Sequence, residues 1–214
     1  MILLLACTQD DGHGPIPKED RPPLDDTDTD ADSDTDTDSD TDTDTDSDTD
    51  ADTDTDTEDV SEACDPAVHG WPAASTAFEE RVVVLVNQER ARGGDCGKYG
   101  SFAPSGPLTM EAHLQCAARY HSYWMAENDV FEHESPGGNL GDDPWERMTA
   151  AGYPGFGVGE NIAAGYADPT SVVAGWMDSD GHCSNILNGD ATEIGVGYYA
   201  GGSWGTYWTQ DFGS

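Results

Sequence analysis

The chain has 214 residues and a formal net charge of −36, with 8 Lys and Arg residues in all. So few basic side chains exclude recognition of a phosphate backbone, and we expect no nucleic-acid partner. The acidic residues are unevenly distributed: residues 1–62 hold 24 of the 44, together with only 2 basic side chains. The large apolar residues lie almost entirely in 63–214. Only that part can bury a core, and about 150 residues is an ordinary size for one domain.

Residues 1–7 are similar to the end of an export signal. They finish in Leu-Leu-Ala-Cys, which resembles the bacterial lipobox, in which Cys7 would be diacylated and become the mature N-terminus. The apolar run is shorter than an ordinary signal peptide or membrane span. We expect an exported protein that is held at the bacterial outer membrane or cell surface through the lipid anchor on Cys7, or is otherwise secreted.

Residues 8–62 are predicted to be a disordered acidic stalk. Residues 25–58 alternate Asp with Thr, Ser or Ala and contain no aromatic side chain. Such a segment buries no apolar surface and its carboxylates repel one another, so it should act as an extended spacer. The repeat lacks the glycine turn of an ordered calcium-binding loop, which leaves diffuse cation association as the expected behaviour.

The predicted helices of the domain at 63–214 are, in chain order, 76–92, 109–128, 144–151 and 171–177. The first has Thr76 as its N-cap candidate with Glu79 three residues later, as in a capping box. Its apolar residues recur at helical spacing, and Gly93 ends it. The second begins at the N-cap candidate Thr109.

The remaining patterned segments are predicted strands at 160–164, 193–199 and 205–212. The last two show β-rich alternation and flank a turn signal at 200–203, which indicates an antiparallel hairpin. Since the helices come first and the hairpin last, the pattern predicts an α+β domain with helices packed on a small antiparallel sheet.

Four cysteines other than Cys7 fit an oxidising compartment. They allow three pairings, and the sequence alone does not choose among them. Cys96 follows the first predicted helix and Cys116 lies in the second, which favours Cys96–Cys116 and leaves Cys64–Cys183. A zinc site is the alternative, although the spacing Cys-x-x-Cys does not occur.

Several motifs resemble the CAP superfamily, which includes the cysteine-rich secretory proteins, antigen five and the plant pathogenesis-related proteins of group one. In chain order, the matching segments are Asn87–Arg90, Phe131–Pro136, Gly159–Ala163, Gly175–Ser179, Gly181–Asn188, Glu193–Tyr198 and Tyr207–Gly213. Each is short, but their order matches that of bacterial extracellular members. The resemblance implies a three-layer α-β-α sandwich.

The resemblance also implies a cleft built from two histidines and two acids. By motif, His133 and His182 are the histidines and Glu160 is the first acid. Two imidazoles and a carboxylate would suit a divalent cation such as zinc or magnesium, and could also work as acid and base. The second acid of eukaryotic members is replaced by Ser179, which puts a four-ligand metal site in doubt unless Asp178 or Asp180 takes its place.

A less specific interpretation is that His133, Glu160 and His182 satisfy one another and nearby amides, and only hold loops together. His121 lies on an apolar helix face and is expected to be a hydrogen-bonded core histidine. For catalysis, His133, Glu160 and His182 are the candidates, but the sequence supplies no activated nucleophile, and Ser135 and Ser184 are only neighbours in the chain.

We therefore expect a monomer that acts as a non-catalytic binding module displayed outside the cell. The resemblance suggests a small apolar ligand, a cell-envelope component or a protein partner, bound through the His/Glu cleft. A metal-dependent hydrolase using the same cleft is the first alternative, and a structural surface protein is the second.

Overall fold

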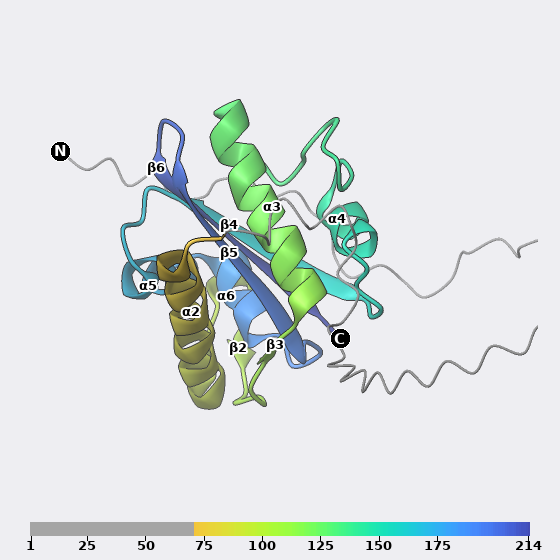
Figure 1. The fold of residues 1–214 in the computed structure, drawn as a ribbon. Coiled ribbons are helices and arrows are strands. Elements are labelled where there is room, and N and C mark those ends of the chain that lie inside the picture. The colour runs from red at the N-terminus through yellow and green to blue at the C-terminus, as the bar shows by residue number, and fades with distance from the viewer. Residues whose placement is uncertain (1–70) are drawn as a thin grey trace, which may run out of the picture. The chain divides into compact units, whose positions relative to one another are not determined.

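The computed structural model describes residues 71–214, drawn as coloured ribbon in Figure 1. The predictions for segments 1–7 and 8–62, including Cys7, lie outside these residues. In chain order the elements are α2 (Ala73–Arg92), β1 (Gly94–Asp95), the 3-10 helix η2 (Gly97–Tyr99), β2 (Ser101–Phe102), β3 (Thr109–Met110), α3 (Ala112–Asn128), α4 (Pro144–Ala150), β4 (Gly157–Ala164), α5 (Pro169–Met177), α6 (Asp180–Leu187), β5 (Glu193–Gly201) and β6 (Gly205–Gly213).

The main sheet has the strand order β3-β5-β6-β4, so β4 lies at one edge. Strands β5 and β6 form the predicted hairpin, and β4 pairs antiparallel with β6. The short β3 pairs parallel with β5, which makes the sheet mixed rather than purely antiparallel. Strands β1 and β2 form a separate two-stranded ribbon.

Helices cover both faces of the main sheet. One core cluster joins apolar side chains of α2, α5 and α6 to β5 and β6, with Val86, Trp176 and Phe212 among its members. Clusters on the other face join α3 to α4 and to strands β4 and β6. In Figure 1, helix α3 lies across the central strands. The predicted α+β class and the three-layer α-β-α sandwich are confirmed.

Helix α3 approaches β5 closely because glycines occupy the contact. A Cβ atom at Gly195 would lie 2.0 Å from the Leu114 carbonyl carbon, and one at Gly197 would lie 2.3 Å from that of Ala118. Both distances are far below van der Waals contact. The two glycines of the strand motif therefore let the helix backbone rest directly on the sheet.

Glu79 has a different role from the predicted one. Helix α2 begins at Ala73, three residues before the predicted start, and has no side-chain N-cap. The Glu79 carboxylate is fully buried and accepts hydrogen bonds from Arg119 Nη2 at 2.6 Å and from Trp71 Nε1 at 3.0 Å. The pairing with Arg119 ties α2 to α3, so the charge three residues after Thr76 serves tertiary packing rather than a capping box.

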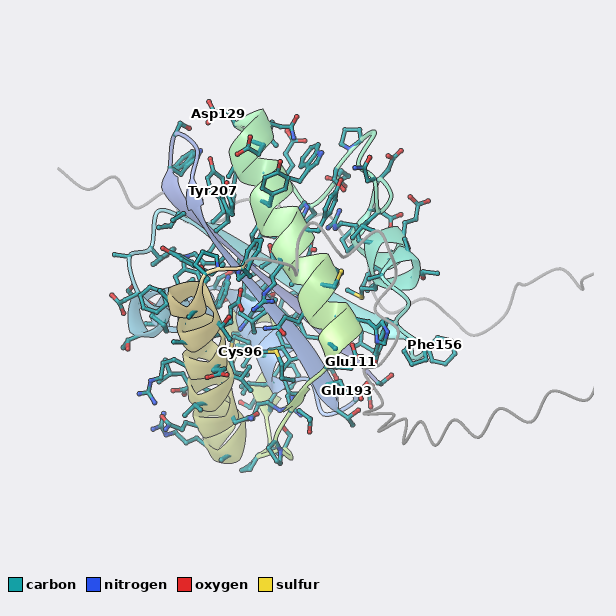
Figure 2. The ribbon with its side chains drawn as sticks, viewed as in Figure 1. Cys96, Glu111, Asp129, Phe156, Glu193 and Tyr207 are labelled. Atoms are coloured by element: carbon teal, nitrogen blue, oxygen red, sulfur yellow. A yellow bond between two sulfur atoms is a disulfide. The ribbon has the colours of Figure 1, made fainter. Side chains whose placement is uncertain are left out.

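Some boundaries also differ from prediction. Thr109 lies in β3, and α3 starts at Ala112 with Glu111 as its N-cap, since that carboxylate accepts from the Leu114 amide at 2.7 Å (Figure 2). Helix α6 was not predicted as a separate element, because its Gly- and Ser-containing sequence gives little helical signal. Within residues 71–214, no helix is both long and apolar enough to cross a membrane.

The predicted cysteine pairs are wrong. Cys96 is bonded to Cys183, so neither Cys96–Cys116 nor Cys64–Cys183 forms (Figure 2 labels Cys96). The physical reason is that the main sheet separates Cys116 from the other two cysteines. Cys96 and Cys183 belong to the core on the α2, α5 and α6 face, whereas Cys116 belongs to the cluster of α3 and α4 on the opposite face. Nearness in the chain was therefore a poor guide to nearness in space.

Candidate functional site

The predicted residues His133 and Glu160 are hydrogen-bonded to each other. His133 follows α3 in a loop, and Glu160 lies on the edge strand β4. His133 Nδ1 lies 2.7 Å from Glu160 Oε1, so this nitrogen carries the proton and donates to the carboxylate. The Glu160 side chain is 2% exposed, whereas that of His133 is 31% exposed. The Glu160 carboxylate is therefore fixed in the interior, whereas the His133 ring reaches solvent.

The pair favours its charged forms. Burial opposes a charge on His133, but the hydrogen bond to Glu160 and the negative charges of Glu160 and Glu134 outweigh it, so the His133 pKa is raised. Burial would likewise raise the pKa of Glu160, yet the charge of Arg147 and the hydrogen bond from His133 hold that pKa well below its usual range. Near neutrality, an ionised carboxylate thus faces an imidazole that keeps its second proton more strongly than usual.

Arg147 completes the surroundings of Glu160 and was not foreseen from the sequence. It comes from α4 and is fully buried. Its Nη2 donates to Glu160 Oε2 at 2.7 Å and to the His133 carbonyl at 2.8 Å. Its Nη1 donates to Ser135 Oγ at 2.7 Å. The two carboxylate oxygens of Glu160 are therefore shared between His133 and Arg147.

A second carboxyl group lies beneath the pair. Asp211 of β6 is directly opposite Glu160 in the β4–β6 register and is fully buried. As an ionised carboxylate it would have no hydrogen-bond donor among the described residues, whereas as a carboxylic acid it can donate to Glu160. Burial and the Glu160 charge raise the Asp211 pKa well above its ordinary value, so Asp211 holds its proton.

His121 supports the same network from α3. It is fully buried, and its Nε2 donates to the Glu132 carbonyl at 2.9 Å, which confirms the expected hydrogen-bonded core histidine. Burial lowers the His121 pKa to about 3, which keeps the ring neutral. Its bond to the loop just before His133 helps fix the path of that loop.

His182 reaches the site from α6, on the other side of the sheet edge. Its backbone carbonyl accepts from Asn161 Nδ2 at 3.3 Å, and Asn161 in turn is bonded to Asn185 and Gln210. Burial first, and then the nearby charge of His133, lower the His182 pKa to about 4. The two histidines are thus close enough to interact electrostatically, but the hydrogen bonds that place His182 run through its backbone.

The described residues do not fit the predicted divalent cation. Among residues 71–214, no group of three or more His, Cys, Asp or Glu side chains is placed to hold a metal ion. Both Glu160 oxygens are occupied, one of them by a guanidinium that would repel a cation. Asp180, a candidate for the missing acid beside Ser179, accepts instead from the Lys98 amide at 3.1 Å. The other candidate, Asp178, ends α5 and is exposed.

The two serines near the histidines have structural contacts. Ser135 Oγ donates to the Gly141 carbonyl at 2.8 Å and accepts from Arg147. Ser184 Oγ donates to the Gly181 carbonyl at 2.7 Å within its own helix. Neither hydroxyl is bonded to a histidine that could act as its base, which is the arrangement that activates a serine nucleophile.

The sequence carries no signal for Arg147, and its signal for Asp211 can be read only once the position of β6 in the sheet is known. A charged residue in a seven-residue helix such as α4 is normally exposed, so nothing in the pattern marks Arg147 as buried. Asp211 lies between Gln210 and Phe212 in a strand that is covered on both faces. A carboxyl group in such a central strand is a strong indication of a buried polar network, once the strand is known to be central.

Comparison with known proteins supports the motif assignment. The model of the cysteine-rich secretory protein family, CAP, matches residues 83–212. The uncharacterized protein YkwD of Bacillus subtilis (strain 168) is 38% identical over 141 residues, which cover 66% of this chain and 49% of YkwD. The uncharacterized membrane protein YlbC of the same strain is 33% identical over 143 residues, which cover 66% of this chain and 36% of YlbC.

A solved structure matches as well. An extracellular protein containing an SCP domain from Bacillus anthracis str. Ames aligns with a TM-score of 0.54 and 28% identity, over 65% of this chain and 41% of that one. This chain spans about half or less of the length of each of these proteins. Since the family model covers well over half of the sequence, from the helix motif near Asn87 to the closing strand, the chain belongs to the cysteine-rich secretory protein (CAP) family.

Proposed function

We propose that this protein is an exported CAP-domain module that binds a cell-envelope ligand at the site formed by His133 and Glu160. Export is supported by the extracellular SCP-domain protein of Bacillus anthracis that it resembles. In this proposal Cys7 is the lipid anchor, and segment 8–62 is the stalk that holds the domain outside the cell.

The observation that carries the proposal is the partly exposed imidazole of His133. Its Nδ1 is fixed on the buried Glu160, so the solvent-exposed part of the ring is its outer edge, with Nε2. When the ring is protonated, Nε2 is a charged hydrogen-bond donor in a fixed direction. A donor held in place before binding loses little conformational freedom when a ligand arrives.

A donor at His133 Nε2 calls for a ligand that carries a hydrogen-bond acceptor, such as a carboxylate or hydroxyl oxygen. An aromatic contact suits an apolar portion as well: Phe131, two residues before His133, and Trp204 of the β5–β6 turn have ring centroids 6.3 Å apart, and Trp204 is 40% exposed. Of the expected classes, a small, mainly apolar ligand that carries an acceptor oxygen fits these features best. The metal-dependent hydrolase alternative is not favoured, because one Glu160 oxygen accepts from the Arg147 guanidinium, whose charge would repel a cation at that carboxylate.

Thermal denaturation of the full chain with dodecanoate, a sterol and soluble peptidoglycan fragments tests the proposal. We expect at least one probe to raise the melting temperature saturably, and His133→Ala to weaken that binding about tenfold or more, since a charged hydrogen bond contributes about 1.5–3 kcal/mol. His113→Ala is the matched control, because His113 Nδ1 also lies 2.7 Å from a carboxylate, that of Glu111, outside the site.

Two outcomes would count against the proposal. If no probe shifts the melting temperature of the wild-type protein, the predicted ligand classes are wrong. If a probe binds the His133→Ala and wild-type proteins equally, the ligand lies elsewhere on the molecule and the site has only a structural role.

A further inference from the structure

Arg147 contacts both the loop that carries His133 and the edge strand β4 that carries Glu160. Its guanidinium donates to the Glu160 carboxylate on β4, to the His133 carbonyl and to the Ser135 hydroxyl, all between 2.7 and 2.8 Å. The side chain is fully buried. It therefore links helix α4, the loop that carries His133 and the edge strand through a single planar group.

Glu160 needs a counter-charge, because a buried carboxylate without one is strongly destabilising. His133 supplies a positive charge only while its ring is doubly protonated, and it loses that second proton at high pH. A guanidinium stays charged at every accessible pH. A divalent cation bound to Glu160 would lie next to this fixed positive charge, where repulsion is strong because little water screens it.

We propose that Arg147 is the permanent counter-cation of Glu160 and the positioning residue of His133, in the place where a bound metal ion would otherwise balance the carboxylate. The inference goes beyond ligand binding, because it concerns how the site is held whichever molecule binds there. Arg147 acts through Glu160 and the loop backbone, and it does not touch solvent or ligand itself.

The geometry requires arginine rather than lysine. Three acceptors lie in different directions around one flat group, and a guanidinium presents two terminal nitrogens in a fixed fork. A lysine ammonium is a single point charge on a flexible stem, so it could neutralise Glu160 without also holding the His133 carbonyl and the Ser135 hydroxyl. Arg147→Lys therefore separates the charge of Arg147 from its positioning role.

Calorimetric titration with zinc and magnesium chloride tests the counter-cation. We expect the full-length wild-type protein to show no saturable binding that depends on His133 or Glu160. Weak heat from the acidic segment 8–62 would persist unchanged in His133→Ala, which therefore serves as the baseline. Saturable binding by the wild type that His133→Ala abolishes would overturn the inference.

The positioning role is tested through the Nδ1 proton of His133, observed by nitrogen-edited NMR of the imidazole rings. We expect a proton protected from exchange in the wild type that is lost in Arg147→Lys and Arg147→Met, because the loop is no longer held against β4. Arg90→Lys is the control for general destabilisation, since Arg90 is equally buried but donates to backbone carbonyls such as that of Ile186 at 2.8 Å.

The Nδ1 proton should remain in Arg90→Lys. Its unchanged presence in Arg147→Lys would show that Glu160 alone positions His133, and would refute the positioning role. If Arg147→Met does not fold, the lysine variant and the wild-type metal titration still decide both parts of the inference.

Discussion

At the scale of single residues, Asp211 keeps a proton next to the candidate site. It faces Glu160 across two paired strands, and both groups are almost completely buried. Two ionised carboxylates in that position would repel each other strongly, so one of them stays protonated. Arg147 and His133 stabilise the charge on Glu160, which leaves the proton on Asp211.

This arrangement makes stability depend on pH through Asp211. Its pKa is higher in the folded protein than in the unfolded chain, so its contribution is fully present below the ordinary value of 3.8 and is lost as pH rises toward the folded value. We predict that Asp211→Asn, which keeps a donor toward Glu160, is more stable than wild type near neutral pH by about 1 kcal/mol or more.

Urea denaturation at several pH values measures this difference. The advantage of Asp211→Asn should shrink or vanish near about pH 4, where the unfolded aspartate also holds a proton. Asp211→Ala is the comparison variant, because it removes the charge together with the hydrogen bond and leaves a cavity. An Asp211→Asn protein that is less stable than wild type near neutrality would show that Asp211 is ionised in the fold.

At the scale of elements, two contacts of different kinds help hold α6 to the rest of the domain. Its polar face is bonded to β4, where Asn185 Nδ2 donates to the Glu160 carbonyl at 3.2 Å and to Asn161 Oδ1 at 2.9 Å. A covalent attachment is the disulfide from Cys183 to Cys96, just before η2. Because α6 also carries His182, these contacts set where that histidine lies.

Removing the disulfide should loosen α6 and lower global stability. The two cysteines are 87 residues apart, so the bond restricts the unfolded chain substantially. We predict that the double variant Cys96→Ala and Cys183→Ala is less stable by about 2–5 kcal/mol in chemical denaturation. Peptide mapping under non-reducing conditions should recover Cys96 joined to Cys183, and a Cys96–Cys116 peptide would contradict the structure.

Prediction of the elements from sequence succeeded where local signals were strong. The β5–β6 hairpin and the helix that ends at Gly93 follow from alternation, turn residues and a glycine stop. The start of α3 was misplaced because Thr109 and Glu111 are both plausible caps, and pairing of β3 with β5 decides between them. The disulfide was misassigned because no local pattern tells which face of the sheet a cysteine occupies.

At the scale of the whole molecule, the site exists because an edge strand receives contributions from both helical layers. Glu160 points toward the layer of α3 and α4, where it meets Arg147. Its neighbour Asn161 points toward α6, where it holds the backbone of His182. Strand alternation therefore explains why two adjacent residues of one motif serve opposite faces.

The motif residues His133, Glu160 and His182 could be found from sequence because family resemblance marks them directly. Arg147 and Asp211 could not, since their importance comes from burial, and burial depends on how α4 and β6 pack around β4. The expectation of a bound cation arose because the burial of Arg147 beside Glu160 could not be read from the sequence. Two imidazoles and a carboxylate favour a metal ion only until a guanidinium is found beside the carboxylate.

The most direct test of the central claim is the pKa of His133, measured by NMR titration in wild type and in Glu160→Gln. The account predicts a wild-type pKa above the ordinary 6.5, because the Glu160 charge outweighs burial. In Glu160→Gln it should fall below 6.5, since burial, the largest effect on this pKa, and the Arg147 charge are then opposed only by the charge of Glu134. A His133 pKa that is the same in both proteins would contradict the pairing on which the proposed function depends.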